Sequence, residues 1–197
     1  MLIKATNAGA QGNNIQVVIA GITLDASGDP TKTKFDLTAT ETDTYTGLTT
    51  ATIAQSIGTD QAPVGSGLVH VVQASVHVDR TPANGAKDLP PPADFDDSGA
   101  NLVFPLDVRA GMGATDPKVH VTIANADEAA KTFDLTATWS RRVTGVTTAT
   151  AASALAALGY LVTVSAPPSG AFSVPTAGTF SLSGGAGTPA SAILFAA

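Results

Sequence analysis

The strongest constraint on the fold of this chain is a six-residue segment that occurs twice in its sequence. Phe35 to Thr40 reads FDLTAT, and the same letters return at Phe133 to Thr138. Thr46 to Thr52 then matches Thr144 to Thr150 at the same spacing of 98 residues, so that 12 of the 18 aligned positions from Phe35 onward are identical. Two copies at so long a spacing do not make a solenoid, which stacks at least three repeats of 20 to 50 residues. The repeat predicts a tandem duplication with two sibling domains.

Each copy has two stretches in which apolar residues alternate with polar ones, the pattern of strands with one buried face. The repeat itself is the second of these stretches, and a short helix is expected after it, over 53–57 and over 151–158. A glycine in the C-cap position ends each of these helices. We therefore expect a mainly β protein with two tandem small β-sandwich or β-barrel domains, each with a short helix. The apolar strand positions are Ile15, Val17, Ile19, Phe35, Leu37 and Ala39 in the first copy and Val119, Val121, Ile123, Phe133, Leu135 and Ala137 in the second.

The composition of 81–101 differs from that of its surroundings, because it holds Pro90-Pro91-Pro92 and three nearby aspartates. Consecutive prolines favour an extended, semi-rigid spacer. We expect a first domain over 1–80, a linker over 81–101 and a second domain over 102–197.

Composition and charge exclude several classes of partner. Only 13% of the residues are charged, the net charge is −6, and there is no cysteine. Binding of nucleic acid needs clustered Lys and Arg, whereas the only adjacent basic pair here is Arg141-Arg142, for which we expect a strand end or turn. The stretch from Ala149 to Ala166 is too short and too interrupted to cross a bilayer, and the amino terminus lacks the apolar region of a secretory signal. We expect neither nucleic acid nor a membrane as a partner.

The residues that could carry chemistry do not form a recognisable site. Asp25 and Asp29 lie in a loop that faintly resembles a calcium loop, but Pro30 stands where such a loop needs glycine. The histidines lack the spacing of a zinc site, and neither a nucleophile elbow nor a phosphate-binding loop is present. We predict no catalytic residue, no metal, no cofactor and no enzymatic activity. The remaining residues weighed, all interpreted as surface positions of loops and strands, are Asp94, Asp96, Asp97, His70, His77 and His120.

Three segments in order resemble a known family. Gly9 to Ile19, with its Gly-Asn-Asn turn before a β-branched strand, resembles the opening of the small β-barrel domain of phage contractile-tail sheath proteins. The Phe35-Asp36-Leu37 strand, the strand from Tyr160 to Val164 and the glycine-rich close from Leu182 to Gly187 resemble later segments of that domain. The opening motif matches the family best in the first copy, and the closing motif matches it best in the second. Both halves of the chain correspond to the small domain, which leaves no room for the contractile core.

The resemblance implies a non-enzymatic structural or accessory protein of a phage virion, assembled in the host cytoplasm. Such a protein would decorate a tail or capsid and contact other virion proteins, as a homo-oligomer or on a symmetric scaffold. The alternative is a carbohydrate- or receptor-binding module of a phage adhesion apparatus. For the contacts we single out an apolar end that could add a strand to a neighbour, and a tryptophan that is either core or interface: Ile193, Leu194, Phe195 and Trp139.

Overall fold

The computed structural model describes the chain in segments. These are residues 2–6, 10–29, 31–59, 67–72, 81–89, 93–96, 102–109, 118–147, 150–159, 161–165, 175–185 and 192–194. The described residues are mainly β, with short helical segments, as the alternation predicts.

The order of elements repeats along the chain. Among the described residues, those up to Asp96 give three strands, an α-helix and three strands, and those from Leu102 give the same order, apart from the 3-10 helices. The first series comprises β1 (Leu2–Ala5), the 3-10 helix η1 (Ala10–Asn14), β2 (Ile15–Thr23), β3 (Lys34–Leu48), α1 (Ile53–Ile57), β4 (Val69–Val71), β5 (Gly85–Leu89) and β6 (Ala93–Asp96). The second comprises β7 (Leu102–Val108), β8 (Val119–Asp127), β9 (Thr132–Thr147), α2 (Ala151–Ala154), η2 (Leu155–Leu158), β10 (Val162–Ser165), β11 (Gly178–Ser181) and β12 (Ala192–Leu194). From here on, the first copy means β1 to β6 and the second copy means β7 to β12.

The range 81–101, which the sequence favours as a linker, contains two strands of the first copy. The edge strand β5 lies in this range and pairs with β8, and β6 pairs with β7. Sequence reasoning missed these strands because only Leu89 of β5 is buried, so the strand has no apolar alternation. Its counterpart in the second copy is β11, since Pro82, Gly85 and Leu89 match Pro175, Gly178 and Leu182 in spacing.

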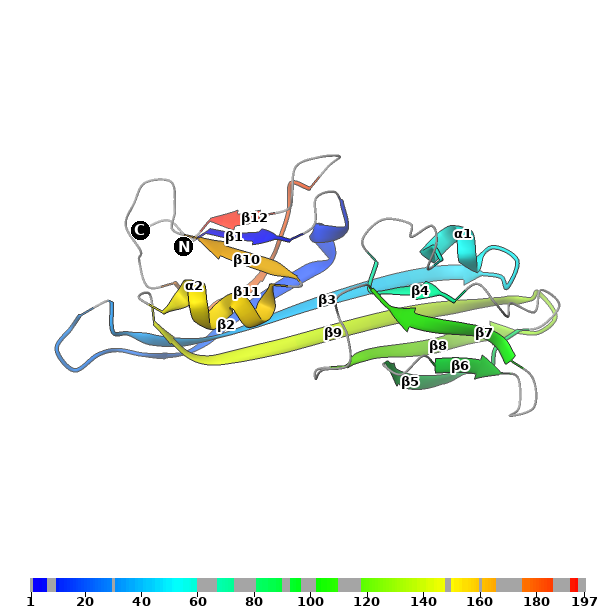
Figure 1. Ribbon diagram of the computed structural model, residues 1–197, viewed down its shortest axis with the longest axis horizontal. Helices are drawn as coiled ribbons and strands as arrows, with labels where there is room; N and C mark the ends of the chain where they lie inside the picture. Colours follow the sequence, from blue (N-terminus) through cyan, green and yellow to red (C-terminus); the bar gives the residue numbers. More distant parts are fainter. Residues whose placement is uncertain are drawn as a thin grey trace. The chain divides into compact units, whose positions relative to one another are not determined.

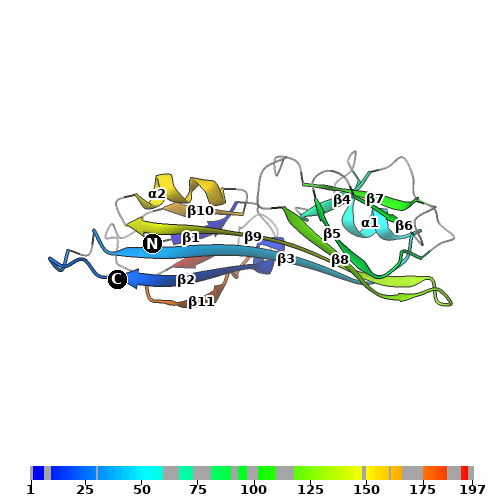
Figure 2. The ribbon, with the colours of Figure 1, turned by 90° about the horizontal axis from the view of Figure 1, so that it is seen from below.

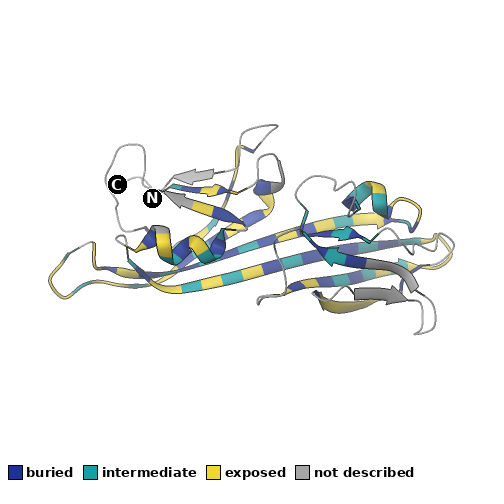
Figure 3. Cartoon of the chain, viewed as in Figure 1, coloured by how far each residue is buried: buried dark blue, intermediate teal, exposed yellow. Residues whose placement is uncertain are grey.

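The described strands form three sheets. A six-stranded sheet has the order β11-β2-β3-β9-β8-β5, and two three-stranded sheets have the orders β10-β1-β12 and β4-β7-β6. The long strands β3 and β9 are neighbours at the middle of the first sheet (Figures 1 and 2). Figure 3 shows buried residues alternating with intermediate or exposed ones along the first part of each strand, as expected for strands with one buried face.

The chain divides into two compact units that do not coincide with the two copies. Unit 1 comprises Met1–Glu41 and Ser140–Ala197, and unit 2 comprises Thr42–Trp139. Unit 1 therefore takes β1, β2 and the beginning of β3 from the first copy, and the end of β9 with everything after it from the second. Unit 2 takes the complementary halves. These boundaries differ from the expected division at 80 and 102, because each long strand passes from one unit into the other.

Both units have the same internal register. In unit 1, Ile19 pairs with Leu37 on one side and with Gly178 on the other. In unit 2, Ile123 pairs with Leu135 and with Gly85 in the same way. The sheet and the helix of each unit bury an apolar core.

The core of unit 1 includes Ile3, Val17, Ile19, Phe35, Leu37, Leu155, Leu158 and Leu182, and that of unit 2 includes Ile53, Ile57, Leu68, Leu89, Leu106, Val121, Phe133 and Leu135.

Candidate functional site

In each copy, the aspartate of the FDLTAT segment accepts a hydrogen bond from a glycine of the other copy. In unit 1, Asp36 Oδ1 accepts a hydrogen bond from the Gly145 amide at 2.9 Å, and its Oδ2 accepts one from Arg142 Nη2 at 2.6 Å. The hydrogen bonds from Arg142 and from the Gly145 amide both lower the pKa of Asp36 below its ordinary value of 3.8. Gly145 has φ +66°, a left-handed conformation that favours glycine. The carboxylate thus binds the backbone amide at a left-handed position within β9, a strand of the second copy.

The same contact occurs in unit 2 with the copies reversed. Asp134 Oδ1 accepts from the Gly47 amide at 2.8 Å, and Asp134 Oδ2 accepts from Asn125 Nδ2 at 2.7 Å. The Asn125 and Gly47 hydrogen bonds lower the pKa of Asp134. Gly47 has φ +63°. Each copy thus supplies the aspartate that accepts a hydrogen bond from the glycine of the other copy. This reciprocity explains why both residues are identical in the two copies.

The second half of the repeat builds the start of each helix. The amide of Thr49 donates to Thr52 Oγ1 at 3.1 Å, and the amide of Thr52 donates back to Thr49 Oγ1 at 3.1 Å. Thr147 and Thr150 exchange the same two bonds before α2. This reciprocal exchange has the form of a capping box but lies one turn before each helix. It fixes the turn that leads into the helix, whereas the N-cap residues Thr52 and Thr150 make no side-chain cap hydrogen bond.

The opening and closing motifs of the sheath resemblance meet in unit 1. Asn13 Nδ2 donates to the Gly185 carbonyl at 3.3 Å, and the Gly185 amide donates to Asn13 Oδ1 at 3.3 Å. The Leu182 amide donates to the Ile15 carbonyl at 3.0 Å. The two motifs are 172 residues apart in the chain. The structure thus brings the opening motif of the first copy and the closing motif of the second copy together in unit 1.

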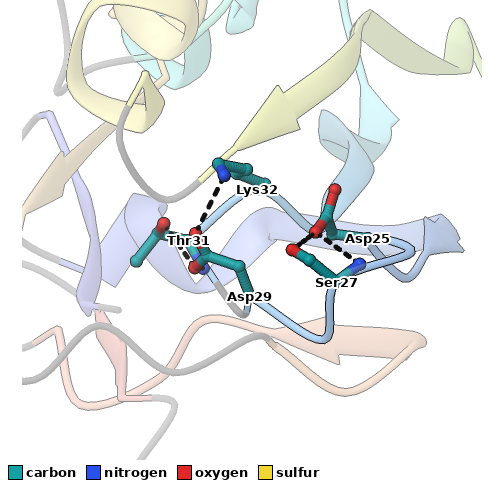
Figure 4. A network of polar contacts seen from close by, with 5 residues as sticks. All are labelled: Asp25, Ser27, Asp29, Thr31 and Lys32. Atoms are coloured by element: carbon teal, nitrogen blue, oxygen red, sulfur yellow. Dashed lines mark hydrogen bonds and ion pairs between the residues drawn. The ribbon is translucent and has the colours of Figure 1, made fainter.

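The loop that weakly resembled a calcium site uses its carboxylates to bind its own backbone and hydroxyls (Figure 4). Asp25 Oδ2 accepts from the Ser27 amide at 2.9 Å and from the Ser27 hydroxyl. Asp29 Oδ1 accepts from the amide and hydroxyl of Thr31, and Lys32 Nζ lies 3.4 Å from Asp29 Oδ2. Hydrogen bonds from Ser27 and from Thr31 lower the pKa of Asp25 and of Asp29, respectively. These are Asx-type turns that shape a hairpin loop.

The other residues considered for metal binding are dispersed. Within the described segments, no three His, Asp or Glu side chains come together as a metal site would require. His70 is half-buried on β4, and His120 Nδ1 lies 2.8 Å from Asp88 Oδ1 on an exposed part of unit 2. Asp94 and Asp96 lie on β6, while His77 and Asp97 fall outside the described residues.

The residues that the sequence favours for contacts with partners lie in different environments. Trp139 is 2% exposed, so in this fold it belongs to the core of unit 2 and offers no surface for a partner. Ile193 and Leu194 lie on β12, which pairs with β1 of unit 1, and Phe195 is outside the described residues. Arg141 and Arg142 lie inside β9 rather than at its end, which corrects the expectation of a turn.

Sequence reasoning missed the contact between Asp36 and Gly145 and its counterpart between Asp134 and Gly47. It placed the aspartates on the outer face of a strand but assigned them no partner. A signal was present, because both residues are identical in the two copies and are separated by eleven positions in each. The separation places them on different segments of one long strand, so their partners had to come from elsewhere.

Comparison of the chain with models of protein families, with curated proteins and with solved structures found no match. The described helices include none of the length and apolarity that crossing a membrane requires.

Proposed function

We propose that this chain is a non-enzymatic structural or accessory protein of a phage virion, acting through contacts with other virion proteins. In this proposal it is a decoration of a tail or capsid, built from the small β domain of contractile-tail sheath proteins without their contractile core. Its partners are tail or capsid subunits, and it is arrayed on a symmetric scaffold or self-associates.

The observation that carries this proposal is the reciprocal pair of hydrogen bonds between Asn13 and Gly185. The resemblance to the sheath family rests on an opening and a close that lie at opposite ends of the sequence. A family domain needs both motifs in one folded unit, and unit 1 contains both. This meeting supports the interpretation of the motifs as parts of one domain.

The use of the carboxylates also favours a structural role. Asp25 and Asp29 bind backbone amides of their own loop, and Asp36 and Asp134 bind amides of left-handed glycines near the ends of β9 and β3. Buried Asp43 accepts the Leu68 amide at 2.7 Å. Groups held in this way stabilise loops and strand ends. Their geometry fits a framework better than acid–base chemistry on a substrate.

Electron microscopy of virions tests the proposal. Particles from a phage that lacks this gene are compared with the parent and with a strain in which a plasmid restores the protein. We expect the deletion to remove a feature of the virion surface and the plasmid to restore it. An unchanged surface, together with absence of the protein from the purified parent particles by mass spectrometry, would contradict the proposal.

The alternative role in host recognition predicts a different result. A carbohydrate-binding module stacks sugars on exposed aromatic rings. Among the residues whose burial is described, Phe35, Phe133 and Trp139 are buried, and Tyr45 and Phe180 are half-buried. Particles that keep their surface structure but lose attachment to the host would favour the alternative.

A further inference from the structure

Each long strand begins in one unit and ends in the other. Asp36 and Gly47 both belong to β3, yet Asp36 lies in unit 1 and Gly47 in unit 2. Asp134 and Gly145 divide in the same way along β9. Because a continuous strand is extended and does not fold back on itself, the aspartate of one copy does not reach the glycine of that copy. Each copy therefore presents contacts that only another copy fills.

The backbone ladders have the same property. The first strand of each copy lies between the fourth and sixth strands of the other copy, as β1 lies between β10 and β12, and β7 between β4 and β6. The second strand of each copy pairs with the fifth strand of the other, as β2 pairs with β11 and β8 with β5. The contacts between copies thus comprise whole main-chain ladders and the apolar cores beneath them.

We propose that this repeat is a self-recognition module whose binding partner is a second copy of the same repeat. The chain is then the covalently fused form of such a pair, and a copy on a separate polypeptide takes the place of the copy present in the same chain. The recognition elements are the Asp–Gly contacts, the paired edge strands and the shared cores. This inference stands independently of the proposed virion role.

Cleavage of the folded full chain tests the proposal. A protease site replaces residues 98–100, between β6 and β7, and the protein is cut after folding. We expect native mass spectrometry to find both fragments in one particle with the mass of the uncut chain, and separate fragments only in denaturant. Fragments that separate in native buffer would overturn the proposal.

A second arm tests whether the partner comes from another polypeptide. The cut protein is unfolded and refolded with an excess of an isotopically labelled second-copy fragment, with the uncut chain refolded in the same buffer as the control. We expect the labelled fragment to replace the unlabelled one in the complex in proportion to its excess. If the uncut chain refolds but no labelled complex forms, the proposal is wrong.

Matched substitutions test which contacts hold the fragments together. In the cut protein, Asp134→Ala removes the contact to Gly47 of the other fragment together with that to Asn125 of its own. Asp25→Ala removes contacts within its own fragment alone. Solvent screens the Gly47–Asp134 contact, so its loss changes the Kd less than the loss of a buried charged hydrogen bond. We expect Asp134→Ala to raise the Kd between fragments about two- to fivefold and Asp25→Ala to leave it unchanged. Equal effects of the two substitutions would contradict the assignment of recognition to the Asp–Gly contact.

Discussion

The repeated residues have separate roles that become visible only in the structure. Phe35, Leu37 and Ala39 fill a core, and Asp36 accepts a hydrogen bond from Gly145 of β9. Thr49 and Thr52 fix the turn that leads into α1. The buried positions could be predicted from the sequence because alternation fixes which face of a strand is apolar. The role of the aspartate could not, because its partner Gly145 is 109 residues away.

The left-handed glycine positions of the long strands are expected to tolerate asparagine better than alanine. Gly145 has φ +66°, and a Cβ built there meets no atom within 4 Å, so the cost of Gly145→Ala is conformational. We expect this substitution to lower the free energy of unfolding by about 1–2 kcal/mol, and Gly145→Asn to lower it less. Gly85→Ala is the matched control, since its Cβ position is equally open and its φ is not left-handed. Urea unfolding measures all three, and equal losses for Gly145→Ala and Gly85→Ala would contradict the strain.

Asp36 and Asp134 are expected to make the free energy of unfolding depend on pH in the acidic range. Their pKa values in the folded protein lie below the ordinary value of 3.8, so the unfolded chain binds more protons and stability falls as pH decreases through the folded pKa. The stabilisation is complete above about pH 5 and is lost progressively below about pH 4. We expect Asp36→Asn and Asp134→Asn to flatten the pH dependence of the free energy of unfolding, measured by urea titration between about pH 3 and 7. Unchanged slopes in both variants would exclude these carboxylates as the cause.

At the scale of elements, patterned strands could be predicted and unpatterned ones could not. The alternation around Phe35 and Phe133 predicts β3 and β9, and the short helix followed by Gly159 is confirmed as α2 with η2. The sequence predicts a linker where β5 lies, because its residues Gly85 to Asp88 are exposed and only its hydrogen-bonded neighbour β8 defines it as a strand. Pairing of this kind depends on tertiary structure and leaves little trace in local composition.

The assignment of β5 to the core of unit 2 has a direct test in Leu89. Its side chain is fully buried, so Leu89→Ala is expected to lower the free energy of unfolding by about 2–5 kcal/mol. Leu24→Ala serves as the control because Leu24 is 76% exposed, and we expect it to have little effect. In a flexible linker the two substitutions would behave alike, and that result in urea unfolding would contradict the assignment.

At the scale of the whole molecule, the sequence repeat predicted two similar bodies, and the chain has two compact units. The expected boundaries separate the two copies along the sequence. In the structure, each unit instead combines one half of the first copy with one half of the second. No local pattern specifies such an exchange, because a strand that ends in its own domain and one that continues into another have the same alternation. In the structure, β3 and β9 have 15 and 16 residues and are long enough to belong to both units, whereas strands of about 5 or 6 residues are usual.

The exchange of halves is tested most directly by a disulfide between Thr40 and Ser140. These residues belong to different copies, and their hydroxyl oxygens lie 2.8 Å apart in unit 1. Because the chain has no cysteine, Thr40→Cys with Ser140→Cys introduces the only thiols. Gln16→Cys with Thr40→Cys is the positive control, since these are paired neighbours on β2 and β3 of one copy. Gln16→Cys with Ser140→Cys is the negative control, because two strand spacings of about 4.8 Å exceed the reach of a disulfide.

The readout is the mass and thiol content of the folded monomer after mild oxidation. We predict that Thr40→Cys with Ser140→Cys forms an intramolecular disulfide as completely as the positive control, while the negative control keeps its thiols. Free thiols in Thr40→Cys with Ser140→Cys, alongside an oxidised positive control, would mean that each copy folds by itself and would contradict the exchange of halves.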